Sequence, residues 1–161
     1  MQQPLRIWWA RPRKLCALER PGGGGRSHRP ERRDAEIAYL KAHGVRFVVS
    51  TMKTRHNLSG YEEAGLEWHH LPVESAAEGA EALEELLPVL RRALRGRGAV
   101  AAHGNRHTDF VAALCAAHLH ETREVDPAAS LAAAARAGLT VTPEACALLG
   151  VEEGIVLELS A

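Results

Sequence analysis

The chain alternates short apolar runs with amphipathic helical segments, and this alternation constrains its fold more than any other feature. Val45–Ser50 is a run of β-branched and aromatic residues that is typical of a buried strand. Before it, apolar residues recur at helical spacing from Ala35 to Ala42, and Gly44 stands where a helix is expected to end. Strands that alternate with helices predict an α/β protein with a central sheet of about five strands flanked by helices. The 161 residues are expected to form one domain.

The remaining segments follow the same logic. Further strands are expected at Leu5–Trp9, Leu15–Leu18, Leu66–Leu71 and Ala99–Ala102. Loops are expected at Pro21–Pro30, Thr51–Gly60 and Pro72–Gly79. A short helical turn is expected at Tyr61–Gly65, and amphipathic helices at Leu83–Leu94 and Phe110–Leu119.

The last third of the chain carries clear helix boundaries. Asp126 before Pro127 and Thr142 before Pro143 are typical helix starts, and Gly138 and Gly150 are typical helix ends. The apolar segment Ile155–Leu159 is expected to be a strand or a partner-facing segment. Residues 151–161 are expected to be a C-terminal extension, and a homo-oligomer is expected through residues 155–159.

Composition excludes several classes of protein. The 20 basic residues balance 20 acidic ones, so long-range attraction to nucleic acid or to an anionic membrane is not expected. No apolar run approaches the roughly 20 residues of a membrane helix, and the N-terminus lacks a secretion pattern, so a cytoplasmic location is expected. The three cysteines, Cys16, Cys115 and Cys146, are odd in number and widely spaced, which argues against a disulfide framework and against a thiolate zinc site.

Three polar segments follow the predicted parallel strands, where ligands bind in open α/β sheets: Ser50–Leu58, Leu71–Ala77 and Ala102–Asp109. The third is the richest in polar side chains. It is expected to start a helix, capped by Thr108 or Asn105, whose unpaired N–H groups and positive dipole end favour an anion. Arg106 and His107 add charge, so an anion site is predicted there. The competing interpretation is a capped connection with solvated side chains.

Nine histidines do not predict a metal site. His69 and His70 are neighbours in a predicted strand and point to opposite faces. His118 and His120 diverge on a predicted helix. Neither a metal nor another cofactor is expected. Separately, Lys53–His56 is a locally basic segment beside the expected site.

In their order and spacing, the segments from about Trp9 to Gly150 resemble the cysteine-dependent dual-specificity and tyrosine phosphatases. The resemblance implies that family's α/β fold, with a phosphate site at the turn after Ala99–His103. The segments that carry it are Arg13–Gly22 (opening strand and Pro-Gly loop), Leu40–Ser50 (helix, Gly and third strand), Tyr61–Val73 (lead-in to the general-acid loop), Ala99–His103 (strand before the nucleophile), Thr108–Leu114 (helix after the phosphate loop) and Thr142–Cys146 (terminal helices).

The chain departs from this family at the reacting group. Members carry His-Cys, five residues, then Arg and Ser or Thr, and the thiolate attacks phosphorus. Here Gly104 follows His103, so the thiol is absent from that place. The loop is shorter by about three residues if Thr108 matches the Ser or Thr, and by about four if Arg106 is the Arg. Glu74 stands near the place of the general-acid Asp. The three cysteines are expected to be small buried residues.

Two hypotheses follow from the resemblance. The first is a pseudophosphatase, catalytically inactive as a cysteine phosphatase, which binds a phosphorylated or anionic ligand, or a protein partner. Its ligand-binding residues are then Gly104, Asn105, Arg106, His107 and Thr108. The second is a repurposed enzyme acting on a phosphorylated or anionic small molecule, with catalytic candidates His103, His107, Asp109 and Glu74. It predicts a closed pocket lined by His103, Asn105, Arg106 and His107.

Overall fold

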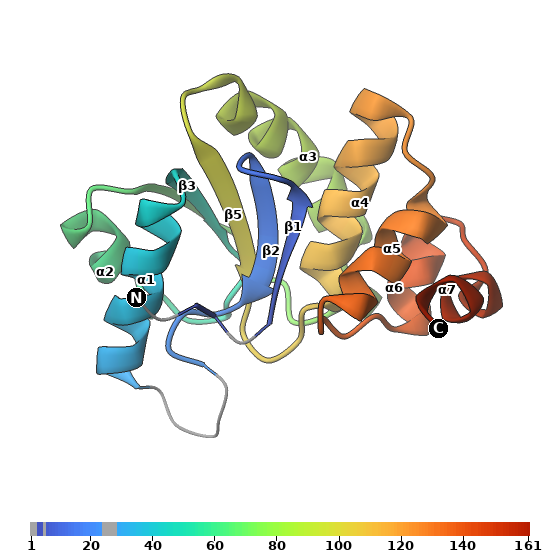
Figure 1. Ribbon diagram of the computed structural model, residues 1–161, viewed down its shortest axis with the longest axis horizontal. Helices are drawn as coiled ribbons and strands as arrows, with labels where there is room; N and C mark the ends of the chain where they lie inside the picture. The colour runs from blue at the N-terminus through green and yellow to red at the C-terminus, as the bar shows by residue number, and fades with distance from the viewer. Residues whose placement is uncertain (1–2, 5, 24–28) are drawn as a thin grey trace.

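Five strands form one sheet in the order β1-β2-β5-β3-β4, with β1 antiparallel to β2 and the other neighbours parallel (Figure 1). The strands are β1 (Ile7–Arg11), β2 (Leu15–Glu19), β3 (Val45–Ser50), β4 (Glu67–His70) and β5 (Ala99–Gly104). The structure is a computed structural model, and it describes residues 3–4, 6–23 and 29–161. The predictions for Leu5 and for residues 24–28 lie outside this range. The predicted α/β fold with a sheet of about five strands is confirmed.

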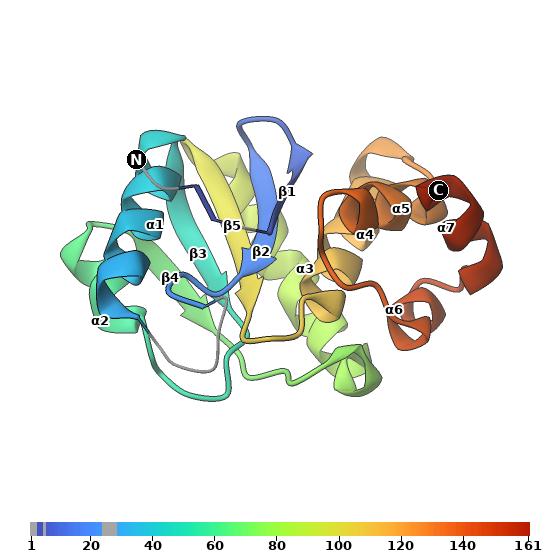
Figure 2. The same ribbon diagram turned by 60° about the horizontal axis from the view of Figure 1, so that its bottom comes forward.

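Helices cover both faces of the sheet (Figure 2). They are α1 (Pro30–Ala42), α2 (Leu58–Glu63), α3 (Ala80–Arg95), α4 (Asp109–Arg123), α5 (Pro127–Arg136), α6 (Pro143–Leu148) and α7 (Glu153–Ser160), with one 3₁₀ turn, η1 (Ala76–Glu78). α1 and α2 close one apolar core over the sheet, and α3 and α4 close the other together with α5. None of these helices is long and apolar enough to cross a membrane.

The central strand β5 and the helix that follows it form the middle of the molecule. Every residue of β5 is buried, and the strand pairs with β2 on one side and β3 on the other. Residues 109–116 of α4 are buried as an unbroken run. A helix that is apolar on all sides must be enclosed, and α3, α5 and α6 enclose α4. The turn between β5 and α4 is therefore held from both ends by buried structure.

The predicted helix boundaries at the C-terminal third are confirmed. The Asp126 carboxylate accepts a hydrogen bond from Ala128 N at 3.3 Å, and the Thr142 hydroxyl accepts one from Ala145 N at 3.2 Å. α2 begins at Leu58, so the predicted loop up to Gly60 was wrong at its end. Asn57 ends this loop in a left-handed conformation, and its Nδ2 donates to Pro21 O at 2.9 Å.

The strand expected at Ile155–Leu159 is wrong, because these residues belong to α7. In a strand, Ile155, Leu157 and Leu159 would share one face. In the helix, successive odd positions lie about 200° apart, so Leu157 points away from the other two. Val156 is buried where α7 packs on α5, and this contact accounts for the helix.

Candidate functional site

A cavity of about 470 Å³ lies beyond the carboxyl ends of β3, β4 and β5. The three polar segments singled out in the sequence meet at this cavity. It is lined by Thr51, Lys53 and Thr54 after β3, by Val73, Glu74 and Ser75 after β4, and by Asn105, Arg106 and His107 after β5. An open α/β sheet places its ligands at this edge, where loops from neighbouring strands converge.

The predicted site residues divide into two groups. Glu74, Asn105, Arg106 and His107 are exposed and line the cavity. The other four, His103, Gly104, Thr108 and Asp109, are buried beneath the turn and do not line it. The structure therefore separates a solvent-facing set, which can meet a ligand, from an inner set, which holds the turn in place.

His103 is fully buried, and protein groups satisfy both ring nitrogens. Nδ1 lies 3.0 Å from Gly104 O and Nε2 lies 2.6 Å from the Tyr61 hydroxyl. A carbonyl can only accept, so Nδ1 carries the proton and Nε2 accepts from Tyr61. Burial lowers the pKa of His103 to about 4 and raises the pKa of the Tyr61 phenol. His103 is therefore neutral at pH 7, and it is buried outside the cavity lining.

The Asp109 carboxylate ties three segments together. Its Oδ1 accepts from Phe110 N at 2.8 Å, and its Oδ2 accepts from Thr142 Oγ1 at 2.8 Å and from Ala76 N at 3.2 Å. Charge-assisted bonds of this kind are the stronger ones in proteins. Asp109 therefore joins the start of α4 to η1 and to the start of α6.

Of the two predicted caps of α4, Thr108 is the N-cap residue, but its side chain makes no capping hydrogen bond. Its hydroxyl instead accepts from Thr140 N at 2.8 Å. Asn105 is exposed in the loop. The Asp109 carboxylate bonds Phe110 N instead, so part of the positive helix end is neutralised from within the protein.

The turn itself is unusually tight at Gly104. A Cβ atom there would lie 2.1 Å from His107 O, a backbone atom that no side-chain movement can displace. On the other side, Thr51 braces the strand end, because its N and Oγ1 both donate to His103 O, at 2.9 and 3.0 Å. Only glycine fits at position 104. The next three residues, Asn105–His107, are exposed and line the cavity.

The cavity carries an excess of basic groups. Lys53 and Glu74 form an exposed ion pair with Nζ and Oε1 3.5 Å apart. Arg106 and His107 form no ion pair within the part of the chain that the structure describes. An anion that enters the cavity therefore meets a free guanidinium and an imidazole, with Lys53 within the same lining.

None of the three thiols reaches this cavity. Cys16, Cys115 and Cys146 are all buried. Burial raises the pKa of Cys115 to about 12 and also raises the pKa of Cys16 and of Cys146. A protonated, buried thiol is a poor nucleophile. Within the described ranges, no three His, Cys, Asp or Glu side chains come together as metal ligands.

Sequence reasoning missed some of the supporting residues. The sequence pattern predicts a helical turn at Tyr61, and nothing local indicates that Tyr61 bonds His103, 42 positions away. The pattern predicts a loop at Thr51 and gives no sign of its bonds to the end of β5. Lys53 belongs to Ser50–Leu58, a segment that the sheet topology predicts at the site, and it lines the cavity. Contacts between distant segments were the information that the sequence pattern lacked.

Comparison with known proteins identifies the fold. No protein-family model and no curated protein sequence matches the chain. Among solved structures, human DUSP28 superposes with a TM-score of 0.67 at 20% identity, covering 99% of this chain and 100% of that one. TpbA of P. aeruginosa gives 0.67 at 19% identity over 92% and 87%, and PTPMT1 gives 0.65 at 15% over 96% of each. The chain has the fold of the dual-specificity and protein tyrosine phosphatases.

The buried His103 predicts a specific acid sensitivity. Its pKa is about 4 in the folded protein against 6.5 for a free side chain, so the unfolded chain binds this proton more readily. Stability from this group is complete above pH 6.5 and is lost as the pH falls toward 4. We expect a loss of about 2 to 3 kcal/mol in the free energy of unfolding between pH 7 and pH 4.5, measured by urea denaturation.

The matched control is His103→Gln, whose amide retains hydrogen-bonding groups but gains no proton in this range. Its acid-induced loss of stability should be smaller than that of the wild type by the same amount. Equal pH dependence in the two proteins would contradict the assignment of His103 as a neutral, buried group.

The tight turn predicts that Gly104→Ala is destabilising. The added methyl overlaps His107 O, so the backbone must move, which we expect to cost about 2 kcal/mol or more in the free energy of unfolding. Gly154→Ala is the control: a Cβ there meets nothing within 4 Å, and alanine favours the helix. Thermal and urea denaturation of both variants test this, and a neutral Gly104→Ala would refute the geometry.

Proposed function

We propose that this chain is a phosphatase-fold binding protein, inactive as a cysteine phosphatase, whose cavity after β3, β4 and β5 holds a phosphorylated or anionic ligand. One observation carries the proposal: basic side chains line the cavity, while every cysteine of the chain is buried elsewhere. The arrangement keeps groups that bind an anion without the thiol that would attack its phosphorus.

The ligand contacts in this proposal come from side chains. Arg106 offers a planar fork of donors suited to phosphate oxygens, and His107 and Lys53 offer further donors. The shortened turn leaves Asn105–His107 as its exposed part, and the Asp109 carboxylate accepts from the N–H group of Phe110, the second residue of α4. The backbone cradle of the resembled family is thus replaced here by a small set of side chains around about 470 Å³.

The other hypothesis, a repurposed enzyme, draws on different residues. His107 and Glu74 both line the cavity and are types that transfer protons in hydrolysis. His103 and Asp109 are engaged in internal hydrogen bonds, so in this alternative the chemistry rests on His107 and Glu74. The pocket is then lined by Asn105, Arg106 and His107, but not by His103.

Phosphotyrosine is the first ligand to test. A variant of TpbA was solved in complex with pTyr, and that protein superposes on this chain with a TM-score of 0.66 at 20% identity. An aryl phosphate also suits the lining, because Val73 offers an apolar contact beside the basic groups.

We expect this chain to bind phosphotyrosine without hydrolysing p-nitrophenyl phosphate. Binding is measured by isothermal titration calorimetry and turnover by release of p-nitrophenol. Arg106→Gln removes a charged donor and should weaken binding about tenfold. Arg95→Gln, an exposed arginine of α3 outside the cavity, should leave the affinity unchanged.

Hydrolysis by the wild type that is abolished in His107→Ala or Glu74→Gln would reject the inactive scaffold and support the enzyme hypothesis. Equal affinity in Arg106→Gln and Arg95→Gln would reject this cavity as the binding site.

A further inference from the structure

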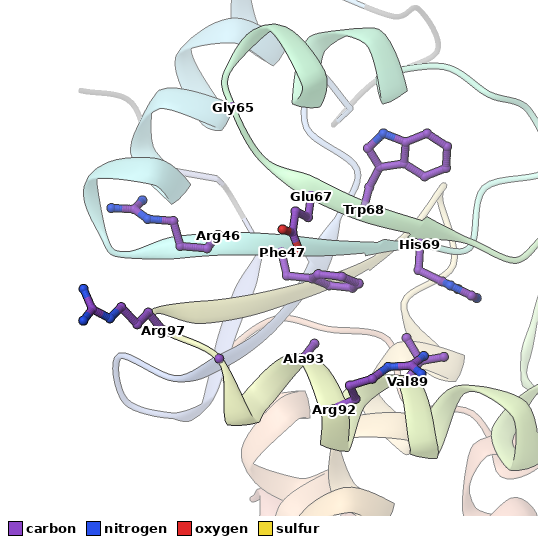
Figure 3. A pocket seen from close by; sticks show the side chains of 11 residues that line it. Arg46, Phe47, Gly65, Glu67, Trp68, His69, Val89, Arg92, Ala93 and Arg97 are labelled. Carbon is purple, nitrogen blue, oxygen red and sulfur yellow. The ribbon is translucent and has the colours of Figure 1, made fainter.

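A second groove, of about 610 Å³, lies between strands β3 and β4, at one edge of the sheet, and the last turns of α3 (Figure 3). It reaches the first residues of β3 and β4 and the loop between α3 and β5. The cavity of the previous section follows the last residues of the same strands. The two sites therefore lie toward opposite ends of the parallel strands and share no lining residue.

Three arginines surround the groove. They come from separate elements: Arg46 from β3, Arg92 from α3 and Arg97 from the loop after α3. All three are exposed, and none forms an ion pair with a carboxylate of the described chain. Glu67 is the acidic residue of the lining. The groove is thus basic on balance, with three arginines to one carboxylate in its lining.

The aliphatic part of Arg46 lies close to Gly98. Gly98 has a φ of +81°, and a Cβ there would lie 2.6 Å from Arg46 Cγ and 2.5 Å from Gly44 O. The aliphatic part of Arg46 therefore occupies space beside Gly98 that a larger residue at position 98 would fill. This places Arg46 beside the loop that carries Arg97, as Figure 3 shows at one end of the groove.

The middle of the groove combines apolar side chains with the carboxylate of Glu67, which lies beside Phe47 (Figure 3). The Phe47 ring points into it from β3, opposite Val89 and Ala93 of α3 (Figure 3). Arg92 and His69 lie at the end away from Arg46 and Arg97. The lining thus places arginines at both ends of the groove, with Phe47, Val89, Ala93 and one carboxylate, Glu67, between them. Charges at two separate ends fit an elongated ligand better than a compact one.

We propose that this groove binds an acidic peptide segment of a partner protein, with an apolar side chain on Phe47 and carboxylates at both ends on the arginines. Charge complementarity carries the proposal, because three arginines without an ion-pair partner in the described chain line the groove together with one carboxylate. Basic residues also stabilise the C-terminal turn of a helix, which explains Arg92. That effect does not explain Arg46, which belongs to a strand and reaches the same groove.

The probe is a fluorescein-labelled peptide, Asp-Asp-Ala-Leu-Ala-Asp-Asp, titrated against the full chain and followed by fluorescence anisotropy. We expect saturable binding that Arg92→Gln and the double variant Arg46→Gln/Arg97→Gln each weaken, by about fivefold per arginine removed. Arg95→Gln, on the same helix but outside the groove, is the matched control and should bind as the wild type does.

Three results would overturn the proposal. The first is no saturable binding up to about 1 mM, the weak end of specific association. The second is equal affinity for the peptide in which asparagine replaces every aspartate. The third is competition by inorganic phosphate or AMP at the same concentrations as unlabelled peptide, which would make the groove a small-anion site.

Location is tested separately by amide NMR. Peptide-induced shifts at Phe47, His69 and Ala93 would support the groove, and shifts confined to Asn105–His107 would assign the peptide to the other cavity and overturn the proposal. Because the two sites share no lining residue, a failure here leaves the proposed function of the first cavity untouched.

Discussion

The end of strand β5 is the constraint on which the rest of the site depends. His103 is the last large side chain of that strand, and its imidazole is held between Tyr61 and Gly104 O in the buried interior. Its carbonyl receives two hydrogen bonds from Thr51. These bonds fix the point at which the chain leaves the sheet, so the following residues must turn at once toward α4. A buried polar group without such partners would destabilise the fold, and here each partner also determines where the cavity loop begins.

The dense polar run from His103 to Asp109 therefore performs two tasks. Its buried members pair with the protein: His103 with Tyr61, and Asp109 with η1 and α6. Its exposed members, Asn105 to His107, face the cavity. Polar residues that are close in sequence are easily taken for one catalytic cluster. Burial separates them, because a side chain whose hydrogen-bonding groups are satisfied internally has none left for a ligand.

The sequence predicts those structural features that depend on residues close together in the chain. Strand and helix periodicity identified the α/β sheet, and Asp126 and Thr142 marked helix starts that the structure confirms. Placing loops after parallel strands located the cavity, since topology alone brings those loops together. The errors arose where distant contacts decide. Packing against α5 makes Ile155–Leu159 helical, and Thr140 takes the hydroxyl of Thr108 that was expected to cap α4. No spacing within a short segment encodes such partners.

A chain with zero net charge can have two basic cavities because its acidic and basic residues lie in different places, even within one helix. Helix α3 carries exposed Glu81, Glu84 and Glu85 in its first half and Arg92 and Arg95 near its end, as its dipole favours. The arginine end borders the second groove, while the acidic end faces solvent elsewhere. At physiological ionic strength, charges act over a Debye length of about 8 Å, so a ligand at either cavity responds to the local arginines rather than to the balanced total. A neutral chain of this kind gains selectivity from where its charges lie and forgoes long-range attraction.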